Sequence, residues 1–339
     1  MALQKLFPTG SSWKAIAATG ASGVMLLTGC GGGGGDSDSY EWSLAEAHPE
    51  DYPTTQADIW FADQMRERTD GRIDIQVMHG GQLGEEADVL EQVQMGAVEM
   101  TRVSTSPVSE IVDEFGVFAL PYVFDDTEHL WRFLEGDYAQ GMLDDVRDSG
   151  YVGLAYYEAG ARNFYTTDEP IESPDDLKGQ DIRVLPGTVN VDMIEAMGGS
   201  GVTMDYGEVY SSLENGTITG AENNEPSYVS SGHYETAQYY TRDAHQRIPE
   251  ILMVNADLFD SLSEEDQELM REVAQESIAE QRELWEAEVE SSIAEMEDAG
   301  IEVIDVDTSE FQEATADMVD EHRDEYADVL DAVDEARQE

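Results

Sequence analysis

Residues 73–96, with the sequence IDIQVMHGGQLGEEADVLEQVQMG, decide the fold class of this chain. Their first five residues alternate between apolar and polar side chains, which predicts a β-strand. A glycine-rich loop follows at residues 80–84. Val89, Leu90 and Val93 then recur on one face of a helix that ends at a glycine. Strand, loop and helix in this order are the repeating unit of an α/β domain.

The same pattern continues on both sides of this stretch. The predicted elements are an extended segment at residues 40–47, a helix over 54–69, strands at 151–157, 182–185 and 218–221, and a helix over 189–197. The sequence therefore predicts an α/β fold. The roughly 300 residues that follow the N-terminal segment are enough for two domains.

One unusually long helix is predicted near the C-terminus. Ser263 is suited to cap it, with Asp266 three residues later as in a capping box. Apolar residues recur at three- and four-residue steps as far as Gly300, and thirty-odd residues at about 1.5 Å each span about 50 Å. Because that exceeds the diameter of a small domain, we expect this helix to brace two domains. A coiled-coil dimer helix is the alternative.

The first 29 residues predict a secretory signal peptide. Lys5 and Lys14 give it a basic start, and the apolar run after them is too short for a membrane-spanning helix, which needs about 20 residues. The letters LTGC that end at Cys30 resemble a bacterial lipobox, so we expect Cys30, the only cysteine, to be lipidated. Residues 30–39 then form a flexible tether. This predicts an extracytoplasmic protein that is lipid-anchored to a membrane, in the periplasm or at the outer cell surface. A buried structural thiol is the alternative.

The composition is extremely acidic. The chain has 75 Asp and Glu against 17 Lys and Arg, and its formal net charge is −58. Cleavage before Cys30 would remove Lys5 and Lys14 and no acid, which leaves −60 and Lys178 as the only lysine. Such a charge opposes compaction in dilute buffer but is tolerated in high salt, where the Debye length falls to about 3 Å at 1 M.

We therefore expect a protein from a halophile. Polyanionic disorder is the competing interpretation, but the 40% of hydrophobic residues and their regular spacing argue against it. The lack of a basic stripe excludes nucleic acid as a partner.

No pattern in the sequence indicates catalysis. The six histidines are scattered, with no pair at ligand spacing and no cysteine partner, so no metal site is predicted; they are His48, His79, His129, His233, His245 and His322. No GxSxG motif, phosphate-binding loop or dinucleotide-binding glycine motif is present. We expect a protein without catalytic residues and without a cofactor.

Arginine is the more informative residue type. In so acidic a chain an anionic solute is repelled except where guanidinium groups are concentrated, and the guanidinium fork matches a carboxylate and stays charged when buried. Arg162 follows a predicted strand, and Arg183 lies within one, between Ile182 and Val184. Each arginine either binds a ligand or forms a salt bridge to one of the many acids of the chain, and the sequence pattern leaves both open.

Residues 183–226 carry a resemblance to a known family. Their sequence, RVLPGTVNVDMIEAMGGSGVTMDYGEVYSSLENGTITGAENNEP, closely resembles the signature of the solute-binding proteins of tripartite ATP-independent (TRAP) transporters. Residues 80–100, GGQLGEEADVLEQVQMGAVEM, resemble the same family, and the resemblance covers nearly the whole chain after the N-terminal segment. It implies a protein that captures an organic acid and delivers it to the membrane subunits of a permease.

The resemblance also implies the architecture. It indicates a two-domain periplasmic-binding-protein-like fold of type II, with segments that cross a hinge and the long helix bracing both domains. The expected domains are residues 40–160 plus 249–288, and residues 161–248 plus 289–339. The ligand would lie in the cleft between them and drive its closure.

Several ligand contacts are implied by the family's motifs. Arg183 matches the strand arginine that forms a salt bridge with the ligand carboxylate in the family, and Asn223 matches an asparagine that binds the same carboxylate. Tyr206 matches an aromatic residue that packs on the ligand. The other implied contacts are Arg162, Glu85 and Arg102.

A finer resemblance concerns the ligand. Residues 48–54 (HPEDYPT), 221–228 (AENNEPSY) and 232–235 (GHYE) resemble members that bind uronic acids such as glucuronate and galacturonate. A sugar acid needs partners for its hydroxyl groups, and the side chains expected to supply them include His48, Asn224 and Tyr228. The alternatives are a C4-dicarboxylate or another simple organic acid as the ligand, an extracellular hydrolase, and a sensor without a transporter.

Overall fold

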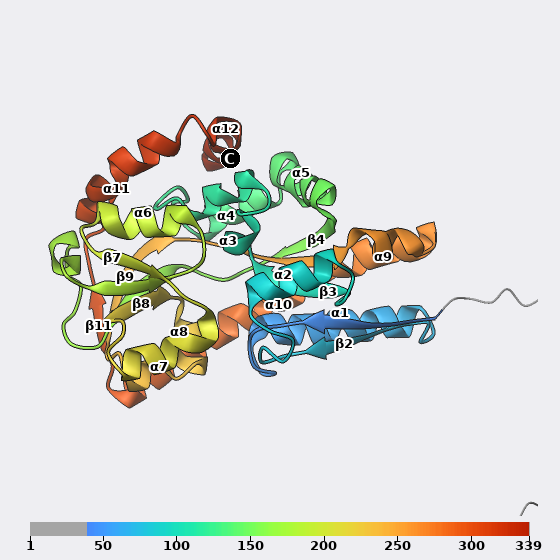
Figure 1. The fold of residues 1–339 in the computed structure, drawn as a ribbon, viewed down its shortest axis with the longest axis horizontal. Helices are drawn as coiled ribbons and strands as arrows, with labels where there is room; N and C mark the ends of the chain where they lie inside the picture. Colours follow the sequence, from blue (N-terminus) through green and yellow to red (C-terminus); the bar gives the residue numbers. More distant parts are fainter. Residues whose placement is uncertain (1–38, 339) are drawn as a thin grey trace, which may run out of the picture. The chain divides into compact units, whose positions relative to one another are not determined.

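The computed structural model describes residues 39–338. The predicted signal peptide, Cys30 and all but the last residue of the predicted tether lie outside them. Two separate β-sheets form the framework, and helices pack on both (Figure 1). The predicted α/β character is confirmed. No helix within residues 39–338 is long and apolar enough to cross a membrane.

The first sheet has the strand order β2-β1-β3-β10-β4. Its strands are β1 (Tyr40–Ala45), β2 (Ile73–Met78), β3 (Met100–Ser104), β4 (Tyr151–Tyr157) and β10 (Glu250–Asn255). β1 pairs in parallel with β2 and β3, whereas β10 runs antiparallel to both of its neighbours. β4 is buried along its whole length, as its continuous apolar sequence YVGLAYY requires.

The second sheet has the order β11-β9-β5-β8-β6-β7. Its strands are β5 (Arg162–Thr166), β6 (Asp181–Val184), β7 (Ser200–Thr203), β8 (Gly220–Asn223), β9 (Tyr239–Gln246) and β11 (Glu302–Asp305). β6 pairs in parallel with β7 and β8, and β5 is antiparallel to β8 and β9. Arg162 follows the strand β4, as predicted, and is also the first residue of β5, a strand that was not predicted.

The chain passes between the two sheets three times. Residues 158–161 lead from β4 to β5, residues 247–249 lead from β9 back to β10, and a long helix leads to β11. The first two passages are only four and three residues long by these bounds and lie beside each other, because the strands they join are paired within each sheet. They are the crossing segments that a hinge between two domains requires.

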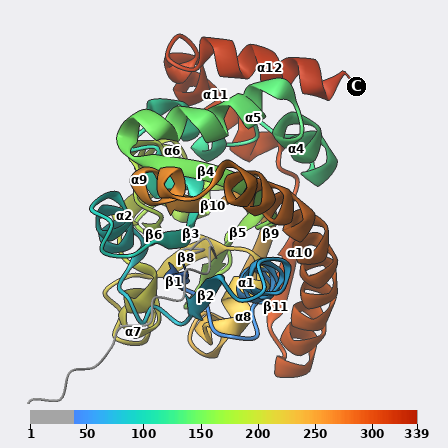
Figure 2. The same ribbon diagram turned by 90° about the vertical axis from the view of Figure 1, so that its right-hand side faces the viewer.

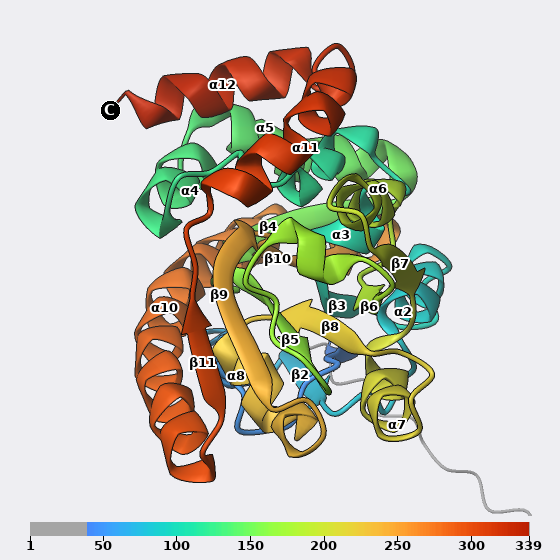
Figure 3. The same ribbon diagram turned by 90° about the vertical axis from the view of Figure 1, so that its left-hand side faces the viewer.

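The long helix is α10 (Glu264–Ala299), with 36 residues. Ser263 Oγ accepts a hydrogen bond from the backbone N–H of Asp266, as predicted, and Gly300 ends the helix in a left-handed conformation at φ 76°. Met270, Val273 and Ala274 pack with the first sheet, whereas Met296 packs with the second. Figures 2 and 3 show α10 running past both sheets, so the prediction of a bracing helix is confirmed within this chain.

The remaining helices cover the sheets. They are α1 (Pro53–Arg68), α2 (Glu86–Gln94), α3 (Thr105–Val108), α4 (Thr127–Leu134), α5 (Asp137–Asp145), α6 (Thr188–Ala196), α7 (Val209–Glu214), α8 (Glu225–Ser230), α9 (Ala256–Ser261), α11 (Ser309–His322) and α12 (Ala327–Arg337). α1 and the first half of α10 enclose one core with the first sheet. A second core lies against the second sheet, and the largest extends from α2 and α4 to α6, α11 and α12.

The division into two domains stays a prediction, and α12 is the segment that fits it least. α11 packs against α6 of the second half, but α12 packs against α4 (Figure 1). The contact includes hydrogen bonds from the side chains of His129 and Arg132 to the carbonyls of Val333 and Ala336, both at 2.8 Å. We therefore propose that residues 327–337 move with the first sheet.

Candidate functional site

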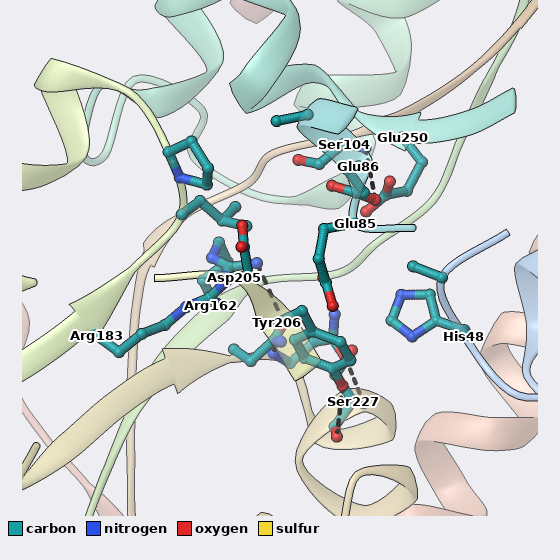
Figure 4. A pocket seen from close by; sticks show the side chains of 16 residues that line it. His48, Glu85, Glu86, Ser104, Arg162, Arg183, Asp205, Tyr206, Ser227 and Glu250 are labelled. Atoms are coloured by element: carbon teal, nitrogen blue, oxygen red, sulfur yellow. Dashed lines mark hydrogen bonds between the residues drawn. The ribbon is translucent and has the colours of Figure 1, made fainter. Parts of the chain in front are cut away.

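A cavity lies between the two sheets and is lined by residues of both. It encloses about 560 Å³ of empty space, which includes part of the open solvent at its mouth. The first half of the chain and β10 contribute Ala47, His48, Glu85, Glu86, Ala87, Ser104 and Glu250. The second sheet and its loops contribute Arg162, Arg183, Leu185, Pro186, Asp205, Tyr206, Asn223, Asn224 and Ser227 (Figure 4).

Seven of the nine predicted ligand-binding residues line this cavity. They are Arg183, Arg162, Asn223, Tyr206, Glu85, His48 and Asn224. They come from β5, β6, β8 and the segments that follow β1, β2 and β7, and the fold brings them to one place. Arg102 and Tyr228 do not line it.

Among the arginines that line the cavity, Arg183 is the one that forms no salt bridge within residues 39–338. It sits in β6 between two buried aliphatic residues and is 1% exposed. Its Nε donates to the carbonyl of Met204 at 2.9 Å, but its Nη1 is buried and has no partner within residues 39–338. Burial lowers the pKa of Arg183; the charge of Glu222 opposes this effect, and that of Arg162 adds to it. Since no carboxylate of the described chain forms a salt bridge with it, the salt-bridge alternative does not hold for Arg183.

Arg162, in contrast, has a carboxylate of its own. Its Nε donates to Glu222 Oε2, and its Nη2 donates to Glu222 Oε1 at 2.9 Å. Although burial favours the neutral acid, Arg162 and His245 lower the pKa of Glu222 to about 2. Arg162 therefore contributes a pair that is nearly neutral, and the uncompensated positive charge of the cavity resides on Arg183.

The two asparagines after β8 have different roles. Asn223 Oδ1 accepts hydrogen bonds from Arg162 Nη1 at 3.2 Å and from the N–H of Asn224 at 2.9 Å, which turns its NH₂ group away from both. Asn224 caps α8 by accepting from the N–H of Ser227 at 2.7 Å and donates to the carbonyl of Ala159 at 2.9 Å. Asn223 thus keeps a donor for a ligand, whereas both polar groups of Asn224 are already used.

Aromatic rings close one side of the cavity. His48 stacks on Tyr52 with ring centroids 3.9 Å apart and meets the edge of Tyr206 at 5.3 Å. Tyr206 also lies 5.9 Å from the guanidinium carbon of Arg183. Burial, followed by the charge of Arg102, lowers the pKa of His48 to about 3, so its ring is neutral at physiological pH. A neutral imidazole and a phenol offer hydrogen bonds without adding charge.

Glu85 connects the two halves across the cavity. Its carboxylate lies so close to the backbone of Gly207 that a Cβ there would stand 2.7 Å from Glu85 Oε1. Glycine at 207 is thus what allows this close approach. Burial, then the nearby Asp205, raises the pKa of Glu85.

Arg102 and Tyr228, the other two predicted contacts, lie outside the lining of this cavity. The side chain of Arg102 is fully buried and its guanidinium is held by three carboxylates, those of Glu46, Glu86 and Glu250, behind the cavity wall. Tyr228 is fully buried as well, and its hydroxyl donates to the carbonyl of Ala237 at 2.5 Å. Both residues stabilise the fold because their polar groups are already satisfied by the protein.

Nine further lining residues were not predicted by the sequence, and five of them are polar. These five are Glu86, Ser104, Asp205, Ser227 and Glu250. Glu86 follows the predicted Glu85 directly, which was a signal, but among 75 acidic residues neither Glu86 nor Glu250 stood out. Within residues 39–338 no group of three or more His, Cys, Asp or Glu side chains is placed to hold a metal ion.

Arg162 is part of a buried network of charged side chains that continues through Glu222 to His245 and Asp243. His245 Nε2 lies 3.6 Å from Glu222 Oε2, and His245 Nδ1 lies 2.8 Å from Asp243 Oδ2. Although burial favours the neutral ring, Asp243 and Glu222 raise the pKa of His245 to about 9. His245 is therefore protonated in the folded state over a range in which an ordinary histidine is neutral.

Because His245 is protonated in the folded state, we expect the stability of the protein to depend on pH. The stabilisation is fully present below the unfolded pKa of about 6.5 and is lost as the pH rises through about 9. We expect the free energy of unfolding to fall by up to about 1.4 kcal/mol per pH unit over this range. Denaturant unfolding in molar KCl between these two pH values measures the slope.

Two histidine variants serve as the comparison. His245→Gln should lack this slope, whereas His79→Gln, at a partly exposed position, should keep it. An equal slope in wild type and His245→Gln would refute the assignment of the proton to His245.

Comparisons with known proteins identify the family of this chain. Residues 44–326 match the family described as bacterial extracellular solute-binding protein, family 7. A solute-binding protein of Chromohalobacter salexigens is 38% identical over 283 residues, which cover 83% of this chain and 82% of that protein.

Two solved structures show the same fold. A TRAP periplasmic solute-binding protein from Pseudomonas putida F1, with bound D-glucuronate, is 38% identical with a TM-score of 0.85 and covers 87% of this chain and 96% of its own. One from Sulfitobacter sp. NAS-14.1, with bound β-D-galacturonate, is 35% identical with a TM-score of 0.84 and covers 88% of this chain and 100% of its own. This chain has the periplasmic-binding-protein fold and belongs to family 7 of the bacterial extracellular solute-binding proteins.

Proposed function

We propose that this protein captures a uronic acid, such as glucuronate or galacturonate, between its two sheets and delivers it to the membrane subunits of a TRAP permease. Its family consists of binding proteins that serve transport, so the chain is not an enzyme and acts outside the cytoplasm. The observation that carries the proposal is Arg183, a buried guanidinium that lines the cavity and whose Nη1 has no partner within residues 39–338. An anion with the planar geometry of a carboxylate is its natural partner.

The rest of the cavity supports a sugar acid over a simple acid. Donors and acceptors lie on several walls rather than at one point: the NH₂ of Asn223, the ring of His48, the hydroxyl of Ser104 and the carboxylates of Glu86 and Glu250. A sugar ring carries hydroxyl groups in several directions and can use such partners. The uronates bound in the two solved relatives add to this argument.

We expect calorimetry in molar KCl to show tighter binding of glucuronate or galacturonate than of succinate or malate. Each ring hydroxyl satisfied by the cavity adds affinity, whereas a buried group left unpaired by a smaller ligand subtracts it. Addition of EDTA should leave the affinity unchanged. Binding of a C4-dicarboxylate with no heat from either uronate would overturn the proposal, and a loss of binding in EDTA that zinc or calcium restores would reveal an unrecognised metal site.

The lipid anchor is part of the proposal. Cleavage before Cys30 and acylation of its thiol would hold the binding protein near its permease, with residues 30–39 as the tether. Mass spectrometry of protein extracted from membranes tests the modification directly. A Cys30→Ser variant that stays in the membrane fraction as fully as wild type would contradict it.

A further inference from the structure

The charged residues that line the cavity are unevenly distributed along it. Arg183 and Arg162 lie at one end, and Glu86 and Glu250 lie together at the other end, next to Ser104 (Figure 4). The four residues come from β6, β5, the start of α2 and the start of β10. A ligand that occupies the cavity therefore meets both lining arginines at one end, where Glu85 and Asp205 also line the wall, and two carboxylates without a lining arginine at the other.

The acidic end already holds more negative charge than its cation balances. Arg102 donates to Glu46 through Nε at 2.8 Å and through Nη2. It also donates through Nη1 to Glu250 at 2.7 Å and to Glu86 at 3.0 Å. One guanidinium thus faces three carboxylates. Burial, together with Glu250 and Glu46, raises the pKa of Glu86 to about 7 despite Arg102, as expected where like charges crowd.

Each of the two lining carboxylates keeps one oxygen for the cavity. Glu86 uses Oε1, which accepts from Arg102 and from the N–H of Ser104 at 3.3 Å, and Glu250 uses Oε2. Glu86 Oε2 and Glu250 Oε1 accept no hydrogen bond from any residue between 39 and 338. These oxygens can accept hydrogen bonds from hydroxyl groups, and such bonds to a charged acceptor are strong.

We propose that Glu86 and Glu250 determine specificity: they bind the hydroxyls of the ligand at the end remote from Arg183 and exclude any acid that carries a second carboxylate there. This inference rests on the proposed function of the cavity. It limits the ligand to monocarboxylic sugar acids, excluding dicarboxylic sugar acids of the same length as well as C4-dicarboxylates. Exclusion by like charge is a means of discrimination that attractive contacts alone do not provide.

The decisive comparison is between galacturonate and galactarate, its counterpart with a carboxylate at both ends. At pH 8, where Glu86 is mostly ionised, we expect calorimetry in molar KCl to show galacturonate bound at least about 100-fold more tightly by wild type. The double variant Glu86→Gln/Glu250→Gln should bind galactarate at least about 10-fold more tightly than wild type does, because a neutral amide no longer repels the second carboxylate. In this double variant the charges of Arg102 and Glu46 still neutralise each other, so the protein should stay folded.

Glu91→Gln is the matched control. It removes one charge from the exposed face of the same helix and should leave both affinities as in wild type. Equal wild-type binding of galacturonate and galactarate would overturn this inference while the proposed function stands. Rejection of galactarate by the double variant as strongly as by wild type would also overturn it, because shape and not charge would then be responsible. Wild type that binds neither galacturonate nor glucuronate, whether or not it binds galactarate, would refute the proposed function and this inference together.

Discussion

Replacement of Arg183 by alanine should lower the affinity for the uronate by roughly 30-fold to several thousand-fold. Removal of one partner of a buried, charge-assisted contact costs about 2–5 kcal/mol, because the ligand carboxylate would be desolvated without a counter-charge. Arg183→Lys should also bind poorly, since an ammonium keeps the charge but lacks the guanidinium fork and cannot reach the same pair of oxygens. Calorimetry on both variants in molar KCl measures the effect.

The stability of the unliganded variants distinguishes a ligand-binding role of Arg183 from a structural role. Arg183 has no carboxylate partner in the described chain, so Arg183→Ala removes a costly buried charge and should unfold at no lower denaturant concentration than wild type. Arg162→Ala should behave in the opposite way. It leaves Glu222 buried without its salt-bridge partner and should destabilise the fold, with a smaller loss of ligand affinity than Arg183→Ala. A folded Arg183→Ala protein with the affinity of wild type would refute the site.

The contrast between Arg183 and Arg102 shows what the sequence could not reveal. Both are fully buried arginines in strands, and both were predicted to face the ligand. What separates them is the residues packed beside them. Arg102 meets Glu46, 56 positions away, and Glu250, 148 positions away, whereas the space beside Arg183 Nη1 holds no acid. Contacts between such distant positions leave no trace in local spacing.

The spacing of apolar residues was sufficient to predict the helices and strands with a regular pattern. The strand–loop–helix unit at residues 73–96, the strand β4 and the 36-residue α10 with its Ser263 cap were all predicted from residue spacing alone. β5 escaped notice because Arg162 and Asn163 interrupt its short apolar pattern, and it is held in place by pairing with β8 and β9, far away in the chain. The position of Asn223 beside Arg162 came from a family resemblance and not from any spacing.

Transfer from 3 M to 0.1 M KCl should lower the melting temperature by about 10 °C or more. Salt at 0.1 M leaves a Debye length of about 10 Å, so neighbouring surface carboxylates repel one another, whereas at molar salt they are screened. For a chain of this size, about 6 kcal/mol of repulsion corresponds to about 10 °C. α10 displays the cause: Glu264, Glu268, Glu272 and Glu276 are exposed at four-residue steps, a spacing at which like charges destabilise a helix.

The same residues provide the test of mechanism. Replacement of Glu264 and Glu268 by glutamine removes two repelling neighbours, and neither of them forms a salt bridge within residues 39–338. The variant should melt above wild type in 0.1 M KCl and at the same temperature in 3 M KCl, because screening already removes the repulsion there. Circular dichroism at both salt concentrations measures this difference. If wild type melts at one temperature in both salts, the acidic composition does not reflect adaptation to salt, because 75 acidic side chains would then be accommodated without screening.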